Sequence, residues 1–169
     1  MALDWTPLID LIRRNQRFVL SSHVRPDADA IGSELGLAHI LQSLGKTVRI
    51  VNPSAAPASL GFLDPTKRVL KIGEGISADE MRDADAHIVV DTSAWTQLQE
   101  IGNVLKTTKA AKGVIDHHVS SDDLGGVVIK DTTAAATGEL IFELGQTLNV
   151  KFSVDVATAL RSEEHTSEL

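Results

Sequence analysis

The sequence predicts an α/β domain of Rossmann-like, three-layer architecture, in which a mainly parallel sheet is flanked by helices. Short apolar runs alternate along the chain with longer segments whose apolar residues recur at helical spacing. The 169 residues are about the length of one domain, and 43% of them are hydrophobic, which is enough for a packed core. Polar residues directly follow three of the apolar runs, and ligands bind beyond the carboxyl ends of the strands in such sheets.

The chain begins with a predicted helix, a strand and a second helix. Residues 4–14 have apolar residues at helical spacing, and Pro7 suits the first turn of a helix. The apolar run 18–20 predicts a short buried strand. Residues 28–44 again show helical spacing, and Gly45 follows as a typical helix-ending residue.

Two further strands and a loop come next. Val48, Ile50 and Val51 predict a strand that ends at Asn52 and Pro53. The stretch 53–65 is rich in Ala, Pro and Ser and predicts a loop with one helical turn, and residues 69–72 predict a short strand.

The second half repeats the alternation of strand and helix. We expect strands at 86–90, 113–115 and 127–129, an amphipathic helix at 133–148, and the start of another helix at 154–160.

The composition excludes several classes of protein. With no cysteine, the chain has no disulfide, no thiolate zinc site and no cysteine nucleophile. No apolar run approaches the length of a membrane span, and residues 1–10 lack the profile of a signal peptide, so a soluble, cytoplasmic protein is expected. A net charge of −7 argues against a broad basic surface for long nucleic acid. A bound metal ion would still allow an acidic cleft to take phosphate.

A histidine and two carboxylates lie close together after the first predicted strand, at His23, Asp27 and Asp29. Imidazole and carboxylate groups are ligands for divalent ions, although either carboxylate could instead cap the following helix. At the start of that helix, Gly32 allows close approach to the backbone, and free amides there could bind a phosphate oxygen.

Two more strand exits carry polar residues. Asp91 follows the strand at 86–90, where a lone aspartate is most often a cap or a turn residue. Asp116, His117 and His118 follow the next strand. Adjacent side chains point to opposite sides, so one imidazole could bind metal while the other contacts substrate or acts as a general acid. A turn with a solvent-facing histidine is the alternative.

Other polar residues favour structural roles. His39 is expected on the surface of a helix, and His87 within a strand, where a weak metal clamp with nearby aspartates is a remote alternative. Residues 106–112 predict a solvated turn, and residues 132–138 could contribute hydroxyl groups to the cleft.

In this combination and order, the pattern H-x-x-x-D-x-D-x-x-G-S at His23–Ser33, Asp91, and the D-H-H at 116–118 resemble three of the four motifs of the DHH phosphoesterase family. The segments 115–125 (IDHHVSSDDLG) and 136–139 (ATGE) resemble its branch of bifunctional oligoribonucleases and PAP phosphatases. The resemblance covers roughly residues 15–160. RecJ-type exonucleases and family II pyrophosphatases share the metal motifs but are weaker matches elsewhere.

The resemblance implies a manganese-dependent phosphoesterase with two ions, for which Mg²⁺ or Co²⁺ are alternatives. By matching position, His23, Asp27 and Asp91 hold one ion, and Asp29, Asp91 and His117 hold the other. Asp91 bridges the two ions and counts as a catalytic residue, and the attacking group is the water between them.

The resemblance also implies roles beside the ions. It makes His118 a catalytic residue that contacts the substrate phosphate. Gly32 and Ser33, at the helix start described above, are expected to contact the phosphate as well. Asp116 is expected to orient His117 without touching an ion itself.

The substrates that the resemblance implies are very short RNA, from which mononucleotides are removed, and pAp, which loses its 3′-phosphate. No membrane partner is expected, and the complete protein could be a homodimer. The alternatives are a pyrophosphatase or a RecJ-like single-strand exonuclease of the same superfamily, or a metal-binding domain without turnover.

The end of the chain departs from the family pattern. The fourth motif, an aspartate, is expected shortly after Leu160, but residues 161–169 (RSEEHTSEL) resemble the translation of a common sequencing adapter. We therefore expect residues 1–160 to be an incomplete catalytic domain and residues 161–169 a non-native tail whose Glu163, Glu164 and His165 bind no metal. The family's C-terminal substrate domain would be absent, and activity impaired.

Overall fold

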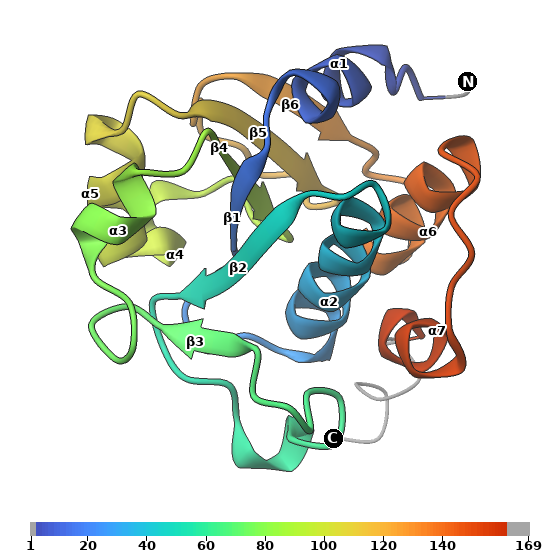
Figure 1. Ribbon diagram of the computed structural model, residues 1–169, viewed down its shortest axis with the longest axis horizontal. Helices are drawn as coiled ribbons and strands as arrows, with labels where there is room; N and C mark the ends of the chain where they lie inside the picture. The colour runs from blue at the N-terminus through green and yellow to red at the C-terminus, as the bar shows by residue number, and fades with distance from the viewer. Residues whose placement is uncertain (1–2, 162–169) are drawn as a thin grey trace.

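The computed structural model describes residues 3–161 and contains a six-stranded sheet between two layers of helices (Figure 1). The strands are β1 (Arg17–Ser21), β2 (Thr47–Asn52), β3 (Val69–Lys71), β4 (Ala86–Val90), β5 (Ala111–Asp116) and β6 (Val127–Lys130). They lie in the order β3-β2-β1-β4-β5-β6, and every pairing between them is parallel. The predicted α/β fold is confirmed.

The helices are α1 (Thr6–Arg14), α2 (Ala28–Ser43), the 3₁₀ turn η1 (Ala58–Leu60), α3 (Ala78–Arg82), α4 (Trp95–Leu98), α5 (Glu100–Thr107), α6 (Thr137–Thr147) and α7 (Val154–Leu160). Figure 1 shows α3, α4 and α5 together on one side of the sheet, and α2, α6 and α7 on the other. None of the helices within residues 3–161 combines the length and hydrophobicity needed to cross a bilayer.

Alternate strand residues fill two separate cores, one on each face of the sheet. In β1, Phe18 and Leu20 belong to the core that α1, α2 and α6 cover, whereas Val19 belongs to the core beneath α3, α4 and α5. Both faces are therefore dry, which explains why the central strands are apolar throughout.

The structure differs from the prediction in its helices. Helices α3, α4 and α5 were not predicted, and the turn predicted at 106–112 is confined to 108–110, because α5 and β5 extend into it. Helix α6 begins at Thr137 rather than 133, because Asp131 accepts hydrogen bonds from the amide and hydroxyl of Thr133 and holds a turn there. Apart from Arg161, the predicted tail lies outside the described residues.

The topology places a crevice between β1 and β4. From β1 the chain continues through α2 to β2 on one side, whereas from β4 it continues through α4 and α5 to β5 on the other. Such a reversal of strand order is where open parallel sheets bind their ligands, beyond the carboxyl ends of the strands.

Candidate metal centre

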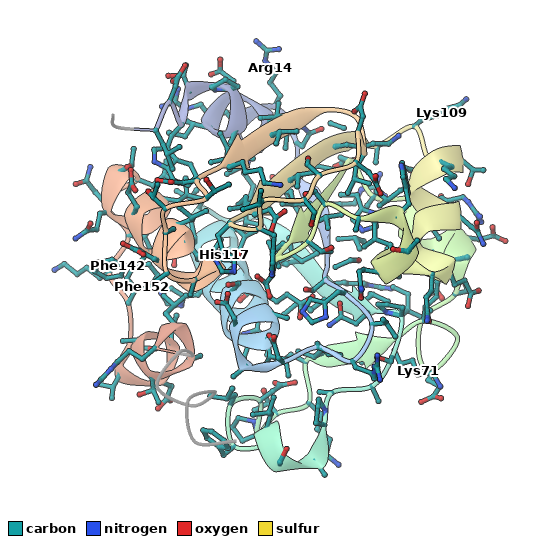
Figure 2. The ribbon with its side chains drawn as sticks, turned by 180° about the vertical axis from the view of Figure 1, so that it is seen from behind. Arg14, Lys71, Lys109, His117, Phe142 and Phe152 are labelled. Atoms are coloured by element: carbon teal, nitrogen blue, oxygen red, sulfur yellow. The ribbon has the colours of Figure 1, made fainter. Side chains whose placement is uncertain are left out.

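The polar residues predicted at three strand exits meet at this crevice. His23 follows β1, Asp91 follows β4, and His117 and His118 follow β5. Asp29 joins them from the first turn of α2. Figure 2 shows His117 near the centre of the molecule, where side chains from several elements converge.

The first cluster contains His23, Asp27 and Asp91, whose nearest ligand atoms all lie within 4.8 Å of one another. His23 Nε2 lies 3.4 Å from Asp91 Oδ2 and 3.8 Å from Asp27 Oδ1. His23 Nδ1 lies 2.9 Å from the carbonyl oxygen of Val24. Because a carbonyl only accepts, Nδ1 carries a proton, and Nε2 is the atom presented to the carboxylates.

The second cluster repeats this arrangement on the other side of Asp91. His117 Nε2 lies 3.6 Å from Asp91 Oδ1 and 3.7 Å from Asp29 Oδ2. Its Nδ1 lies 3.2 Å from the carbonyl oxygen of Ala134, which fixes the ring in the same way. Asp91 therefore offers one carboxylate oxygen to each histidine, which is the position of a bridging ligand.

The pKa values of the first cluster reflect strong electrostatic pairing. Burial alone would lower the pKa of His23, but the facing carboxylates of Asp27 and Asp91 raise it to about 10. Burial raises the pKa of Asp91 to about 6, against the opposing effect of His23. A proton on His23 thus offsets carboxylate charge, and a divalent cation would replace it.

The residues present fit a divalent ion. Nitrogen–oxygen separations of 3.4–3.8 Å are longer than ordinary hydrogen bonds and leave room for a cation between the groups. Imidazole nitrogens and carboxylate oxygens form a mixed donor set that suits first-row divalent metals.

Both aspartates of the α2 segment also cap helices. Asp27 Oδ1 accepts the amide of Ala30 at 3.0 Å, as the N-cap of α2. The carboxylate of Asp29 accepts the amides of Thr137 at 2.8 Å and Gly138 at 2.9 Å, at the start of α6. Capping and metal binding are compatible, because each carboxylate oxygen has two lone pairs.

Asp116 has a different partner from the one predicted. Its Oδ1 accepts a hydrogen bond from His118 Nδ1 at 2.8 Å, whereas His117 is oriented by the Ala134 carbonyl. The prediction that Asp116 orients His117 is therefore wrong. Burial alone would raise the pKa of Asp116, but hydrogen bonds from Ser93, His118 and Lys130 lower it. His118 is thus held by a charged carboxylate beside the two clusters, with its side chain 49% exposed.

The predicted phosphate contact of Gly32 and Ser33 does not fit the structure. Both residues are buried within α2, and the Ser33 hydroxyl donates to Asp29 Oδ1 at 3.4 Å. The amides of the first turn are also used, since Ala30 and Ile31 donate to Asp27. Ser33 instead helps to hold the Asp29 carboxylate.

Two kinds of neighbour complete the site. The Thr137 hydroxyl donates to Asp91 Oδ1 at 2.9 Å, from within the segment expected to contribute hydroxyls. Ser93 and Lys130, which bind Asp116, were not predicted.

The other two described histidines lie outside the two clusters. His87 is buried, with Nε2 2.8 Å from Ser21 Oγ, and His39 Nε2 lies 2.8 Å from the carbonyl oxygen of Lys151.

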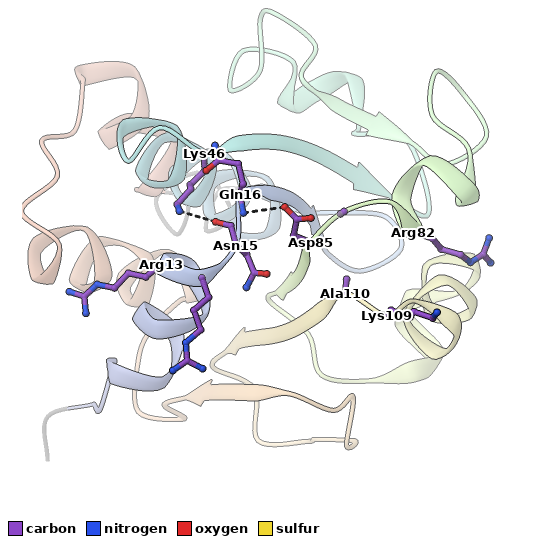
Figure 3. A pocket seen from close by; sticks show the side chains of 10 residues that line it. Arg13, Asn15, Gln16, Lys46, Arg82, Asp85, Lys109 and Ala110 are labelled. Carbon is purple, nitrogen blue, oxygen red and sulfur yellow. Dashed lines mark hydrogen bonds between the residues drawn. The ribbon is translucent and has the colours of Figure 1, made fainter.

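A separate basic pocket of about 600 Å³ lies at the opposite edge of the sheet, where the strands begin (Figure 3). Its lining includes Arg14, Lys46 and Lys109 around Asp85. Asp85 accepts hydrogen bonds from the backbone and guanidinium of Arg17, which lower the pKa of Asp85 to about 2. This pocket contains none of the predicted site residues.

The fold and the site together define an α/β domain that presents paired histidine–carboxylate clusters at the switch point of a parallel sheet. Residues 17–162 match the family described as "DHH family, N-terminal domain", and the chain belongs to this family.

Comparison with a curated relative gives the same assignment. The bifunctional oligoribonuclease and PAP phosphatase NrnA of Bacillus subtilis is 32% identical over 139 residues. The match covers 82% of this chain but 41% of the relative, so the chain spans less than half the length of that protein.

Solved structures support the fold. An exopolyphosphatase-related protein from Bacteroides fragilis superimposes with a TM-score of 0.88 at 27% identity, over 95% of this chain and 49% of that chain. The exonuclease RecJ bound to manganese superimposes with a TM-score of 0.55 at 18% identity, over 95% of this chain and 42% of that chain.

Proposed function

We propose that this chain carries the catalytic centre of a manganese-dependent phosphoesterase that hydrolyses very short RNA or the 3′-phosphate of pAp. One observation carries the proposal: buried Asp91 faces two histidines, each anchored at Nδ1 by a backbone carbonyl and each directing Nε2 at a different oxygen of the same carboxylate. The name of the Bacillus relative supports the choice of substrates.

Each residue of the site has a role in this proposal. His23, Asp27 and Asp91 would hold one ion, and Asp29, Asp91 and His117 the other. Two bound ions supply an activated water and electrostatic stabilisation of the phosphoryl group. His118, held by Asp116, would donate to a phosphate oxygen and stabilise its developing negative charge.

We also propose that residues 1–160 are the catalytic domain of a longer cytoplasmic protein, whose second domain contributes substrate contacts and could support a homodimer. Residues 161–169 would then be a non-native tail. The chain's match to less than half of its curated relative supports this division.

The test is hydrolysis of four substrates in Mn²⁺: pAp, an RNA dinucleotide, pyrophosphate and a longer single-stranded DNA. The test is applied to this chain and to the longer protein in which residues 1–160 continue into the natural sequence instead of residues 161–169. We expect turnover of pAp or the dinucleotide, and turnover of pyrophosphate or long DNA alone would contradict the proposal. Mn²⁺ binding without any turnover in either protein would identify a metal-binding domain instead.

A matched pair of variants tests the bridging position. Asp91→Asn should weaken Mn²⁺ binding more than Asp29→Asn, because a bridging carboxylate serves both ions. Isothermal titration calorimetry measures both, and equal affinities in the two variants would contradict the bridge.

A further inference from the structure

The loop that carries His23 is attached to the end of β2. The Ser22 amide donates to Asn52 Oδ1 at 2.7 Å, and the Arg25 amide donates to Ser54 Oγ at 2.6 Å. Arg25 has a φ of 53°, a left-handed conformation that is unfavourable for a non-glycine residue. The loop therefore depends on outside contacts for its shape.

Asn52 is itself held in one orientation. Its side chain is fully buried, and Nδ2 donates to Glu34 Oε2 at 2.9 Å. If the amide were reversed, its NH₂ group would face the Ser22 N–H, and two donors would meet. The donor at Ser22 and the acceptor at Glu34 Oε2 therefore favour the same orientation of the Asn52 amide.

Glu34 is a costly residue in this position. It is fully buried in α2, no cation forms an ion pair with it among residues 3–161, and its Oε1 has no hydrogen-bond partner there. Burial raises the pKa of Glu34 to about 8, and its charge interacts with those of His23 and Asp91. An apolar side chain would avoid the cost of burying an unsatisfied carboxyl oxygen. Its contact with Asn52 supplies a reason for the carboxyl.

We propose that Glu34 and Asn52 are positioning residues of the metal centre. Glu34 orients the Asn52 amide, Asn52 fixes the Ser22 backbone, and this chain of hydrogen bonds sets the direction in which the adjacent His23 presents Nε2 to Asp91. The inference rests on the proposed function, since its consequence is the affinity for metal.

The experiment measures Mn²⁺ affinity by calorimetry in the full chain. Asn52→Ala and Glu34→Met should each weaken the affinity about 10- to 100-fold, as is typical when a residue that orients a metal ligand is removed. Glu34→Gln should stay within about threefold of the wild type, because its amide oxygen still accepts from Asn52. Val51→Ala is the matched control. It truncates a fully buried β2 residue in the core on the other face of the sheet from α2. The melting temperature in EDTA should therefore fall, while the Mn²⁺ affinity stays unchanged.

The outcomes distinguish a failure of the positioning role from a failure of the proposed function. If the wild type binds no Mn²⁺, the proposed function fails. If the wild type binds Mn²⁺, and both Asn52→Ala and Glu34→Met bind it with the wild-type affinity, the positioning role is wrong and the proposed function stands. A loss of affinity in Val51→Ala as large as in Asn52→Ala would also overturn the positioning role. Should Asn52→Ala not fold, the comparison of Glu34→Met with Glu34→Gln decides alone.

Discussion

His117 and His118 are adjacent in sequence but have different hydrogen-bond partners. His117 Nδ1 is bound by a backbone carbonyl, which leaves Nε2 facing two carboxylates. His118 Nδ1 is bound by the carboxylate of Asp116. A carbonyl and a carboxylate can both orient a metal-binding histidine, so the partner at Nδ1 does not by itself separate the two residues. They differ in what faces Asp91: His117 presents its free Nε2, whereas the nearest nitrogen of His118 is the Nδ1 already bound to Asp116, at 3.9 Å.

Substituting the two histidines separately should therefore have different effects. His117→Ala should lower Mn²⁺ affinity and turnover together, whereas His118→Ala should keep the affinity and lower kcat about 10²- to 10³-fold, by loss of a charge-stabilising donor. Calorimetry and steady-state kinetics in the protein that shows turnover measure both. His39→Ala, outside the two clusters, serves as the control. If His118→Ala loses metal and His117→Ala does not, the two roles are exchanged.

The carboxyl of Glu34 should make stability depend on pH. Its pKa rises from an ordinary value of 4.5 to about 8 in the folded protein, so the unfolded chain releases this proton first as pH rises. Wild type should therefore lose stability relative to Glu34→Gln between pH 4.5 and 8, by on the order of 3–5 kcal/mol. Urea unfolding in EDTA at several pH values measures the difference. A constant difference across this range would show that Glu34 is ionised in the folded protein.

Residue types at strand exits were sufficient to predict which side chains meet, because parallel strands deliver His23, Asp91 and His117 to one edge. Glu34 and Asn52 could not be predicted in this way. A glutamate on a helix is ordinarily solvated, and only the packing of α2 over β2 buries this one against an asparagine eighteen residues away.

At the scale of elements, α6 joins both halves of the site. The amides of its first residues, Thr137 and Gly138, bind Asp29 from the α2 side, and the Thr137 hydroxyl binds Asp91 from the β4 side. The start of this helix therefore fixes the spacing between two of the proposed ligands.

Thr137→Val keeps the shape and the amide of Thr137 but removes the hydroxyl. The buried carboxylate of Asp91 then loses a donor, and unfolding free energy in EDTA should fall by about 1–3 kcal/mol. Thr147→Val removes an exposed hydroxyl of the same helix, which donates to the Glu143 carbonyl, and should change stability by less than about 0.5 kcal/mol. Equal effects of the two substitutions in urea unfolding would argue against a role for the Thr137 hydroxyl.

The strands and long helices were predictable because their apolar runs end at polar or glycine residues. The short helices were not predicted, although α3 carries a readable signal in its capping box of Ser77 and Glu80. Between α4 and α5, Gln99 takes a φ of 46° and interrupts the helical geometry, so neither helix is long enough for a clear period.

For the whole molecule, metal binding should raise thermal stability. An ion held at the switch point would connect residues from both halves of the sheet, and a ligand at 100 times its Kd adds about 2.7 kcal/mol. Differential scanning calorimetry should show the melting midpoint rising by about 5–10 °C in Mn²⁺ and returning in EDTA, with Asp91→Asn unresponsive. Identical midpoints in Mn²⁺, Mg²⁺ and EDTA would count against a preformed site.

The backbone of Asp91 restricts which amino acids can occupy that position at all. Its φ of 62° is left-handed, a conformation that glycine, asparagine and aspartate adopt more readily than other residues. In a saturation library selected only for folding, these three residues should predominate at position 91. In the same library selected for Mn²⁺ retention, aspartate alone should survive, so the two selections separate what the chain geometry demands from what the ion demands.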